Sequence, residues 1–187
     1  MIRTGAWLGV ATALALATPH AVLAQDPPPV PAPAPIDAAV AQVRQAMALM
    51  DQGHPAQAEP LLRSALPVFE ARFGLRHVDV GQIIHLLGLS LADQGRYDEA
   101  EAEMRRALDL ALEVQGAEHP LTAARLNNLA QVLSDGGRYR EAEPLLRQAM
   151  AVAEATHGPD SDSVAAAANN LALSLNAQGR VAEAEPL

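Results

Sequence analysis

The apolar positions of this chain follow a helical spacing. Leu126, Leu129, Ala130 and Leu133 fall on one face of a helix, and the residues between them are largely polar. A turn rich in glycine follows at residues 135–139, and a second pattern of the same kind begins after it. The sequence therefore predicts pairs of amphipathic helices joined by short turns.

This pattern of helix, turn and helix is repeated at a fixed interval. Gly53, Gly95, Gly137 and Gly179 stand 42 residues apart, and the residues around them recur with them. Each glycine can adopt the positive φ that ends a helix. A period of this length indicates a supersecondary unit that buries its apolar face only by stacking on its neighbours. We therefore expect an all-α fold, an α-solenoid of antiparallel helix pairs.

The second helix of each unit carries a recurring alanine five residues after the turn glycine. A side chain this small lets two helix axes approach closely, and Leu62, Met104 and Leu146 are expected to fill the gaps. Glutamate and arginine also recur four residues apart in this helix, as in Glu59 and Arg63. Such a pair forms an exposed ion pair on a helix, so we expect solvated faces here, with ligand binding as the alternative.

These residues resemble the tetratricopeptide repeat in the long form of kinesin light chain, as in LNNLAQVLSDGGRYREAEPLLRQAMAVAEATHGPD. The resemblance is close over residues 79–187 and looser over residues 37–78. A 42-residue unit is longer than the 34-residue form and overlaps HEAT and armadillo units in length. The turn glycine followed by alanine favours the tetratricopeptide family. The resemblance implies a non-catalytic scaffold that binds a protein or peptide partner in a concave groove.

Four repeats are expected, at 37–78, 79–120, 121–162 and 163–187. The first is divergent, because Pro67 falls inside its second helix and should kink it or end it early.

The fourth repeat stops eight residues after its turn glycine, so its second helix can hardly form two turns. We expect the inner face of its first helix, Leu171, Ala172 and Leu175, to lose its cover there, and exposed Leu171 and Leu175 to form an apolar patch. This patch gives a second hypothesis, a structural module that self-associates through its C-terminal edge. A truncated reading frame whose end frays is the alternative.

The first 36 residues differ in composition from the repeats. Residues 1–24 have a basic start at Arg3, an apolar run at residues 6–17 and small residues before a cleavage point after Ala24, as a signal peptide does. An uncleaved N-terminal anchor is the alternative. Residues 25–36 are proline-rich and predict a stiff linker, or less simply a recognition motif. We expect an exported protein, periplasmic or secreted.

The composition excludes several classes of partner. The net charge is −9, aromatic residues make up 3% of the chain, and all thirteen basic residues are arginine. Such a chain lacks the basic surface and stacking platforms of a nucleic-acid-binding protein. The same charge disfavours an anionic membrane, so we expect no membrane contact beyond the signal peptide. The absence of cysteine excludes disulfides and thiolate metal sites.

Few residues suggest catalysis. The six histidines include no pair spaced four apart, as two imidazoles on one helix face would be. His77 and His119 occupy the same loop of successive repeats, so we expect them to bind backbone carbonyls, with Pro120 starting the next helix. No nucleophile elbow or phosphate loop is present. We expect no enzyme activity, no catalytic residues, no metal and no cofactor; an accessory domain of an enzyme is the weaker alternative, resting on scattered histidine and aspartate.

The resemblance places the binding site on the first helices, which line the groove in tetratricopeptide arrays. The side chains at its exposed inward positions are expected to be Gln82, His85, Leu89, Asp93, Asn127, Asn128, Gln131, Asp135, Asn169, Asn170, Leu173 and Asn176. Because an amide both donates and accepts, recurring asparagines can hold the backbone of an extended peptide. The alternative is that the asparagines bond to each other across adjacent repeats. The sequence leaves both open.

Overall fold

The structure, a computed structural model, describes residues 36–186, which lie in a unit spanning residues 33–187. The predicted signal peptide (1–24) and nearly all of the predicted linker (25–36) lie outside the described residues. The described part contains eight helices and no strand. The helices are α1 (Ile36–Asp51), α2 (Pro55–Phe73), α3 (Val78–Asp93), α4 (Tyr97–Gln115), α5 (Pro120–Asp135), α6 (Tyr139–His157), α7 (Asp162–Ala177) and α8 (Val181–Ala184).

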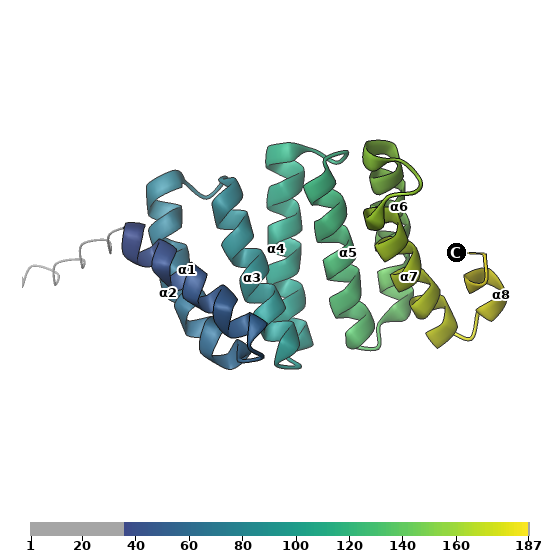
Figure 1. Cartoon of the computed structure of the whole chain (residues 1–187), viewed down its shortest axis with the longest axis horizontal. Coiled ribbons are helices and arrows are strands. Elements are labelled where there is room, and N and C mark those ends of the chain that lie inside the picture. The colour runs from purple at the N-terminus through teal and green to yellow at the C-terminus, as the bar shows by residue number, and fades with distance from the viewer. Residues whose placement is uncertain (1–35, 187) are drawn as a thin grey trace, which may run out of the picture. The chain divides into compact units, whose positions relative to one another are not determined.

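The helices form hairpins stacked in chain order (Figure 1). Each odd-numbered helix has 16 residues, and α2, α4 and α6 have 19 each. Every helix packs on the next one in the chain, and α1 also contacts α3 as α5 contacts α7. This arrangement confirms the predicted all-α solenoid of helix pairs.

The four turn glycines end the odd-numbered helices. Gly95 has φ +75° and Gly137 has φ +77°, in the left-handed region that favours glycine. The Gly95 N–H donates to the Ala92 carbonyl and the Arg96 N–H donates to the Leu91 carbonyl, which is the hydrogen-bond pattern of a Schellman cap. A second set, Gly74, Gly116 and Gly158, ends the even-numbered helices with φ of +86° to +90°. These three glycines were not predicted as helix ends, although they recur at the same 42-residue interval.

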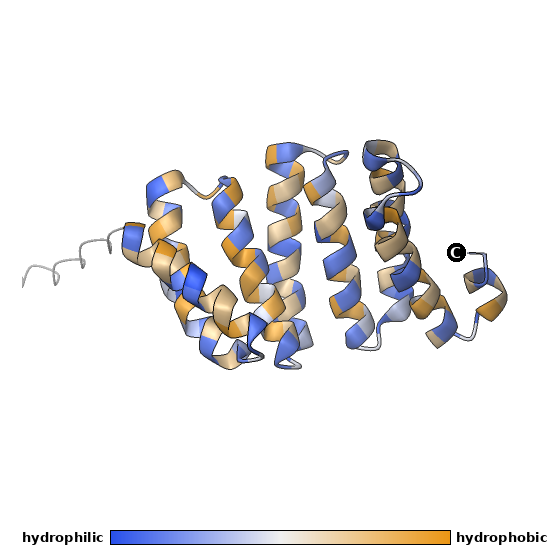
Figure 2. Ribbon diagram, viewed as in Figure 1, coloured by the Kyte–Doolittle hydropathy of each residue, from blue (hydrophilic) through white to orange (hydrophobic). Residues whose placement is uncertain are grey.

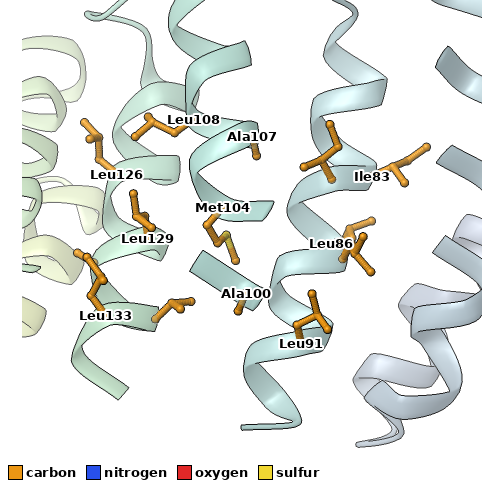
Figure 3. Packing of buried hydrophobic residues seen from close by; sticks show 14 of the residues in the cluster. Ile83, Leu86, Leu91, Ala100, Met104, Ala107, Leu108, Leu126, Leu129 and Leu133 are labelled. Atoms are coloured by element: carbon orange, nitrogen blue, oxygen red, sulfur yellow. The ribbon is translucent and has the colours of Figure 1, made fainter. Parts of the chain in front are cut away.

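Small residues let the paired helices approach, as expected. Ala58, Ala100 and Ala142 are fully buried. A Cβ atom built on Gly88 of α3 would lie 3.1 Å from the Cγ atom of Met104, which is tighter than ordinary contact, so a larger residue would require the Met104 side chain to shift. Figure 3 shows Met104 between leucines of the neighbouring helices. In Figure 2 the helices show hydrophobic and hydrophilic residues around the same ribbon, as amphipathic helices do.

Pro67 does not end its helix early, which was one of the two outcomes expected of it. Helix α2 continues to Phe73 and equals α4 and α6 in length. Pro67 is exposed, whereas Leu62, Ala65 and Phe69 of the same helix are buried. Packing of the buried face therefore holds the helix together although proline removes one backbone hydrogen bond.

The fourth repeat has only four residues in α8, as the sequence predicted. The expected exposure of Leu171 and Leu175 is wrong, because both are at most 2% exposed. They belong to the same core cluster as Leu146 of α6, and helix α6 packs on α7. Of the three residues expected to lose cover, Ala172 does: it is half-buried, whereas Ala130 at the equivalent position of the third repeat is fully buried. Residues 36–186 therefore show no exposed patch of Leu171 and Leu175 that would support self-association.

An ion-pair network joins each hairpin to the next, and we call it the junction clamp. In the first junction, Glu59 of α2 pairs with Arg63 at 2.8 Å and with Arg96 of the next hairpin at 2.6 Å. Arg96 also pairs with Glu99, three residues further on. In the second clamp, Glu101 pairs with Arg105 and Arg138, and Arg138 also pairs with Glu141. In the third clamp, Glu143 pairs with Arg147 and Arg180, and Arg180 also pairs with Glu183.

The clamp corrects the expectation of solvated ion pairs. The i,i+4 pairs are present, but the side chains of Glu59, Glu101 and Glu143 are only 12% to 14% exposed. Burial raises the pKa of Glu143, yet hydrogen bonds from Arg180, Arg147 and Gln178 outweigh it and lower the pKa to about 2. These glutamates therefore connect successive repeats.

Candidate functional site

The predicted groove residues share one side of the stack, which we call the odd-helix face. It comprises Gln82, His85, Leu89 and Asp93 on α3; Asn127, Asn128, Gln131 and Asp135 on α5; and Asn169, Asn170, Leu173 and Asn176 on α7. The exposed members are Gln82, Asp93, Asp135, Asn169, Leu173 and Asn176, and the half-buried members are Leu89, Asn127, Asn128, Gln131 and Asn170. The structure thus leaves eleven of the twelve side chains at least partly accessible.

His85 is the exception, and its expected exposure is wrong. It is 4% exposed among buried leucines and isoleucines of α3. The Nδ2 atom of Asn128 lies 3.1 Å from the Nε2 atom of His85, so the amide donates and this ring nitrogen accepts. Burial, and to a lesser degree the charge of Arg125, lower the pKa of His85 to about 3. His85 is therefore a neutral residue that joins α3 to α5 rather than a residue that contacts a ligand.

The asparagines bond across repeats, which is one of the two alternatives that the sequence left open. Asn170 Nδ2 donates to Asn127 Oδ1 at 3.0 Å and so joins α7 to α5. The partner of Asn127 is the second asparagine of its pair, not Asn169, which is exposed. Asn169 therefore stays available on the surface beside this hydrogen bond.

A buried arginine on α5 was missed by the sequence analysis. Arg125 is 4% exposed, and it donates to Gln82 Oε1 at 2.7 Å across the α3–α5 junction. Burial lowers the pKa of Arg125 to about 10. The sequence carried a signal for it, because Arg125 stands where Ile83 and Ala167 stand in the neighbouring repeats. A single charged residue in a column of apolar ones indicates a special environment.

An acidic pair lies at the C-terminal ends of α3 and α5. Burial and the neighbouring charge of Asp135 raise the pKa of Asp93. Gln131 donates to Asp135 Oδ1 at 2.8 Å. The odd-helix face is thus neutral and amide-rich along its middle and acidic at this end.

The loop histidines are helix caps. His77 Nδ1 accepts from the Asp79 N–H at 3.2 Å, and His119 Nδ1 accepts from the Leu121 N–H at 3.1 Å. The expectation that they bind carbonyls is wrong, because the unpaired groups at the start of a helix are N–H donors. Pro120 begins α5 as expected. Within residues 36–186, no three histidine, aspartate or glutamate side chains form a metal-binding group.

Stacked helical hairpins with Schellman turns and a polar face along their first helices define a repeat scaffold, a class that presents an extended surface for binding other molecules. The tetratricopeptide repeat family model matches residues 37–101, 79–155 and 128–187. The chain belongs to the tetratricopeptide repeat family, whose repeats are protein-interaction scaffolds. No curated protein matches its sequence.

Solved structures show the same fold. Two crystal structures of nearly identical TPR-like repeats, from a Podosopora anserina protein assigned as a kinesin light chain, match with TM-scores of 0.69 and 0.68. Each is 24% identical over 79% of this chain and 70% of the other. BtubC (BKLC) from P. vanneervenii matches with a TM-score of 0.73 at 19% identity, over 79% of this chain and 59% of BtubC. These likenesses confirm the kinesin light chain-like form of the repeat.

None of the helices in residues 36–186 combines the length and the apolar character that a membrane span requires.

Proposed function

We propose that this chain is a non-catalytic scaffold that binds an extended peptide or protein segment along its odd-helix face. The observation that carries the proposal is the run of side-chain amides on this face, which extends over three successive hairpins from Gln82 through Asn127 to Asn176. An extended peptide offers a backbone donor and acceptor at every residue, and amides can satisfy both. Exposed Leu173, at 58%, adds apolar contact area to the same face.

The electrostatics favour a neutral or basic segment. The chain has a net charge of −9, and the face ends in the Asp93 and Asp135 carboxylates. An acidic segment would meet like charges there, which costs affinity and slows association.

A selection of displayed random peptides against the purified chain tests the proposal. Peptides that bind should lose about tenfold in affinity when Asn127 and Asn169 are both replaced by alanine, because each lost hydrogen bond costs roughly 0.5–1.5 kcal/mol. Gln148→Ala is the matched control, since Gln148 is exposed on α6, outside the odd-helix face. Equal affinities of the double variant and the control would overturn the assignment of the face.

We propose further that residues 1–24 direct export to a periplasm or the exterior. The support is the sequence alone, with its basic start, short apolar run and small residues before Gln25. Cell fractionation and mass spectrometry of the mature N-terminus test it. A mature chain that still begins at Met1, found in the cytoplasm, would refute the proposal.

A further inference from the structure

One pocket lies between α5, α6 and α7 and opens on the odd-helix face. Its volume is about 160 Å³. Its inner wall is formed by buried alanines, among them Ala149, Ala153 and Ala167, which are at most 2% exposed. Asn127 and Asn128 also line it, so the pocket has an apolar wall next to two amides of the odd-helix face.

Larger side chains occupy the equivalent place one repeat earlier. The corresponding space one repeat earlier, between α3, α4 and α5, has a volume of only about 10 Å³. Leu121 and Arg125 line that earlier space, and 42 residues later Ser163 and Ala167 stand in their places. The larger side chains fill the space between α3, α4 and α5. The smaller ones leave the equivalent space between α5, α6 and α7 open.

The residues that line the pocket indicate which kind of side chain it can bind. The pocket is lined by Pro120, Ala123, Ala124, Asn127, Asn128, Ala149, Ala153, His157, Ser163, Ala166 and Ala167. None of these is an aspartate, glutamate, lysine or arginine, so a charged side chain would be buried there without an ion-pair partner. The volume is close to the roughly 150 Å³ of an apolar cavity that holds benzene. A neutral side chain of leucine or phenylalanine size therefore fits.

The side-chain amides at the pocket can form hydrogen bonds with the peptide backbone on either side of such a side chain. The hydrogen bonds among the described residues use Oδ1 of Asn127 and Nδ2 of Asn128. This leaves the Nδ2 donors of Asn127 and the Oδ1 acceptor of Asn128 to bind a peptide group.

We propose that this pocket is the anchor site of the odd-helix face and takes one leucine- or phenylalanine-sized side chain of the bound segment. The inference rests on the proposed peptide-binding function and adds its specificity. A buried side chain of this size strengthens binding by a factor of about 10 to 100. Specificity therefore lies in one apolar residue, and the rest of the face binds the backbone.

Titration with N-acetyl-leucinamide and N-acetyl-phenylalaninamide tests the pocket directly. Both should shift the side-chain amide NMR signals of Asn127 and Asn128, and N-acetyl-serinamide should not. Ser163→Leu places at the pocket the residue that fills the earlier site, so it should abolish these shifts. Ala155→Leu, on an exposed position of α6, is the control and should retain them. Ala167→Ile, which copies Ile83, serves as a second filling variant should Ser163→Leu fail to fold.

Absence of shifts with the apolar amides, or equal shifts in a folded filling variant, would overturn the anchor site. Failure of the proposed function has a different signature, because no displayed peptide would then bind any variant. Selected peptides that bind the chain and its filling variants equally would retain the peptide-binding face and reject the anchor.

Discussion

Replacing Gly136 by glutamine should stabilise the fold, because this position is the one place where a recurring junction hydrogen bond is missing. Gln94 Nε2 donates to Glu59 at 3.1 Å in the first junction, and Gln178 Nε2 donates to Glu143 at 3.3 Å in the third. Gly136 is the equivalent residue of the second junction. Its φ of −77° and ψ of 3° are close to the −87° and −1° of Gln94, so a side chain imposes no backbone strain.

The structure also provides room for the new side chain. A cavity of about 170 Å³ lies beside Gly136 and is lined by Glu101, the acceptor that the glutamine needs. A Cβ atom at Gly136 would meet its neighbours at 3.5 Å, which is ordinary van der Waals contact. The Gly136→Gln variant therefore needs no rearrangement of the junction.

The expected gain follows from three contributions. A hydrogen bond to a carboxylate contributes about 1.5–3 kcal/mol. Ordering the glutamine side chain costs up to about 2 kcal/mol. Replacing glycine adds about 0.4–1 kcal/mol by restricting the unfolded chain. With the full ordering cost, the net increase in the free energy of unfolding is about 0–2 kcal/mol, or up to a few degrees in Tm for a domain of this size.

Urea unfolding followed by circular dichroism measures this gain, with Gly136→Ala as the control. Alanine reproduces the backbone contribution alone, so the excess of glutamine over alanine reports the hydrogen bond. That excess should disappear when Glu101 is also replaced by alanine. An excess that persists without Glu101, or no excess at all, would refute the reasoning.

Two further predictions concern acid stability and helix capping. The pKa of Glu143 is lowered to about 2 from an ordinary 4.5, so its stabilising effect is complete above pH 4.5 and is lost as the pH falls toward 2. Because its arginine partners are 35% to 49% exposed, roughly 1–3 kcal/mol should be lost, and Glu143→Gln should flatten this part of a plot of unfolding free energy against pH. His119→Ala removes a helix cap and should lower the free energy of unfolding in urea by about 1 kcal/mol. His54→Ala is the control and should leave it unchanged, because the His54 side chain makes no cap hydrogen bond. Equal losses in the two variants would contradict the capping role.

The sequence predicted the fold because its information is local and periodic. Turn glycines, recurring alanines and helical apolar spacing each act within one hairpin, and their repetition fixes the stacking. The junction clamp could not be predicted in full, because Arg96 lies 37 residues from its partner Glu59. Only the i,i+4 pair with Arg63 was visible in the sequence. The spacing of residues along one helix predicts which of them share a face. It does not predict an ion pair between a glutamate and an arginine of the next hairpin.

The sequence predicted which helices carry the candidate site, but it predicted less well how deeply each of its side chains is buried. The resemblance to the tetratricopeptide repeat placed twelve residues on one face and could not show that His85 lies below its surface. That burial depends on the large side chains around it and on its partner Asn128 in the next repeat. The anchor pocket was invisible for the opposite reason. Its signal is the small size of Ser163 and Ala167, which stands out only once α5, α6 and α7 are seen to surround one space.

The junction clamp has a consequence for how such a protein changes length. The second and third hairpins each carry an arginine, Arg96 or Arg138, that pairs with the preceding hairpin and a glutamate, Glu101 or Glu143, that pairs with the following one. Each of these copies therefore presents the complement of its neighbour. Duplication of one 42-residue unit would bring its own matching ends, and the added hairpin would need no newly evolved interface. The number of hairpins can therefore vary by whole units while each joint stays the same.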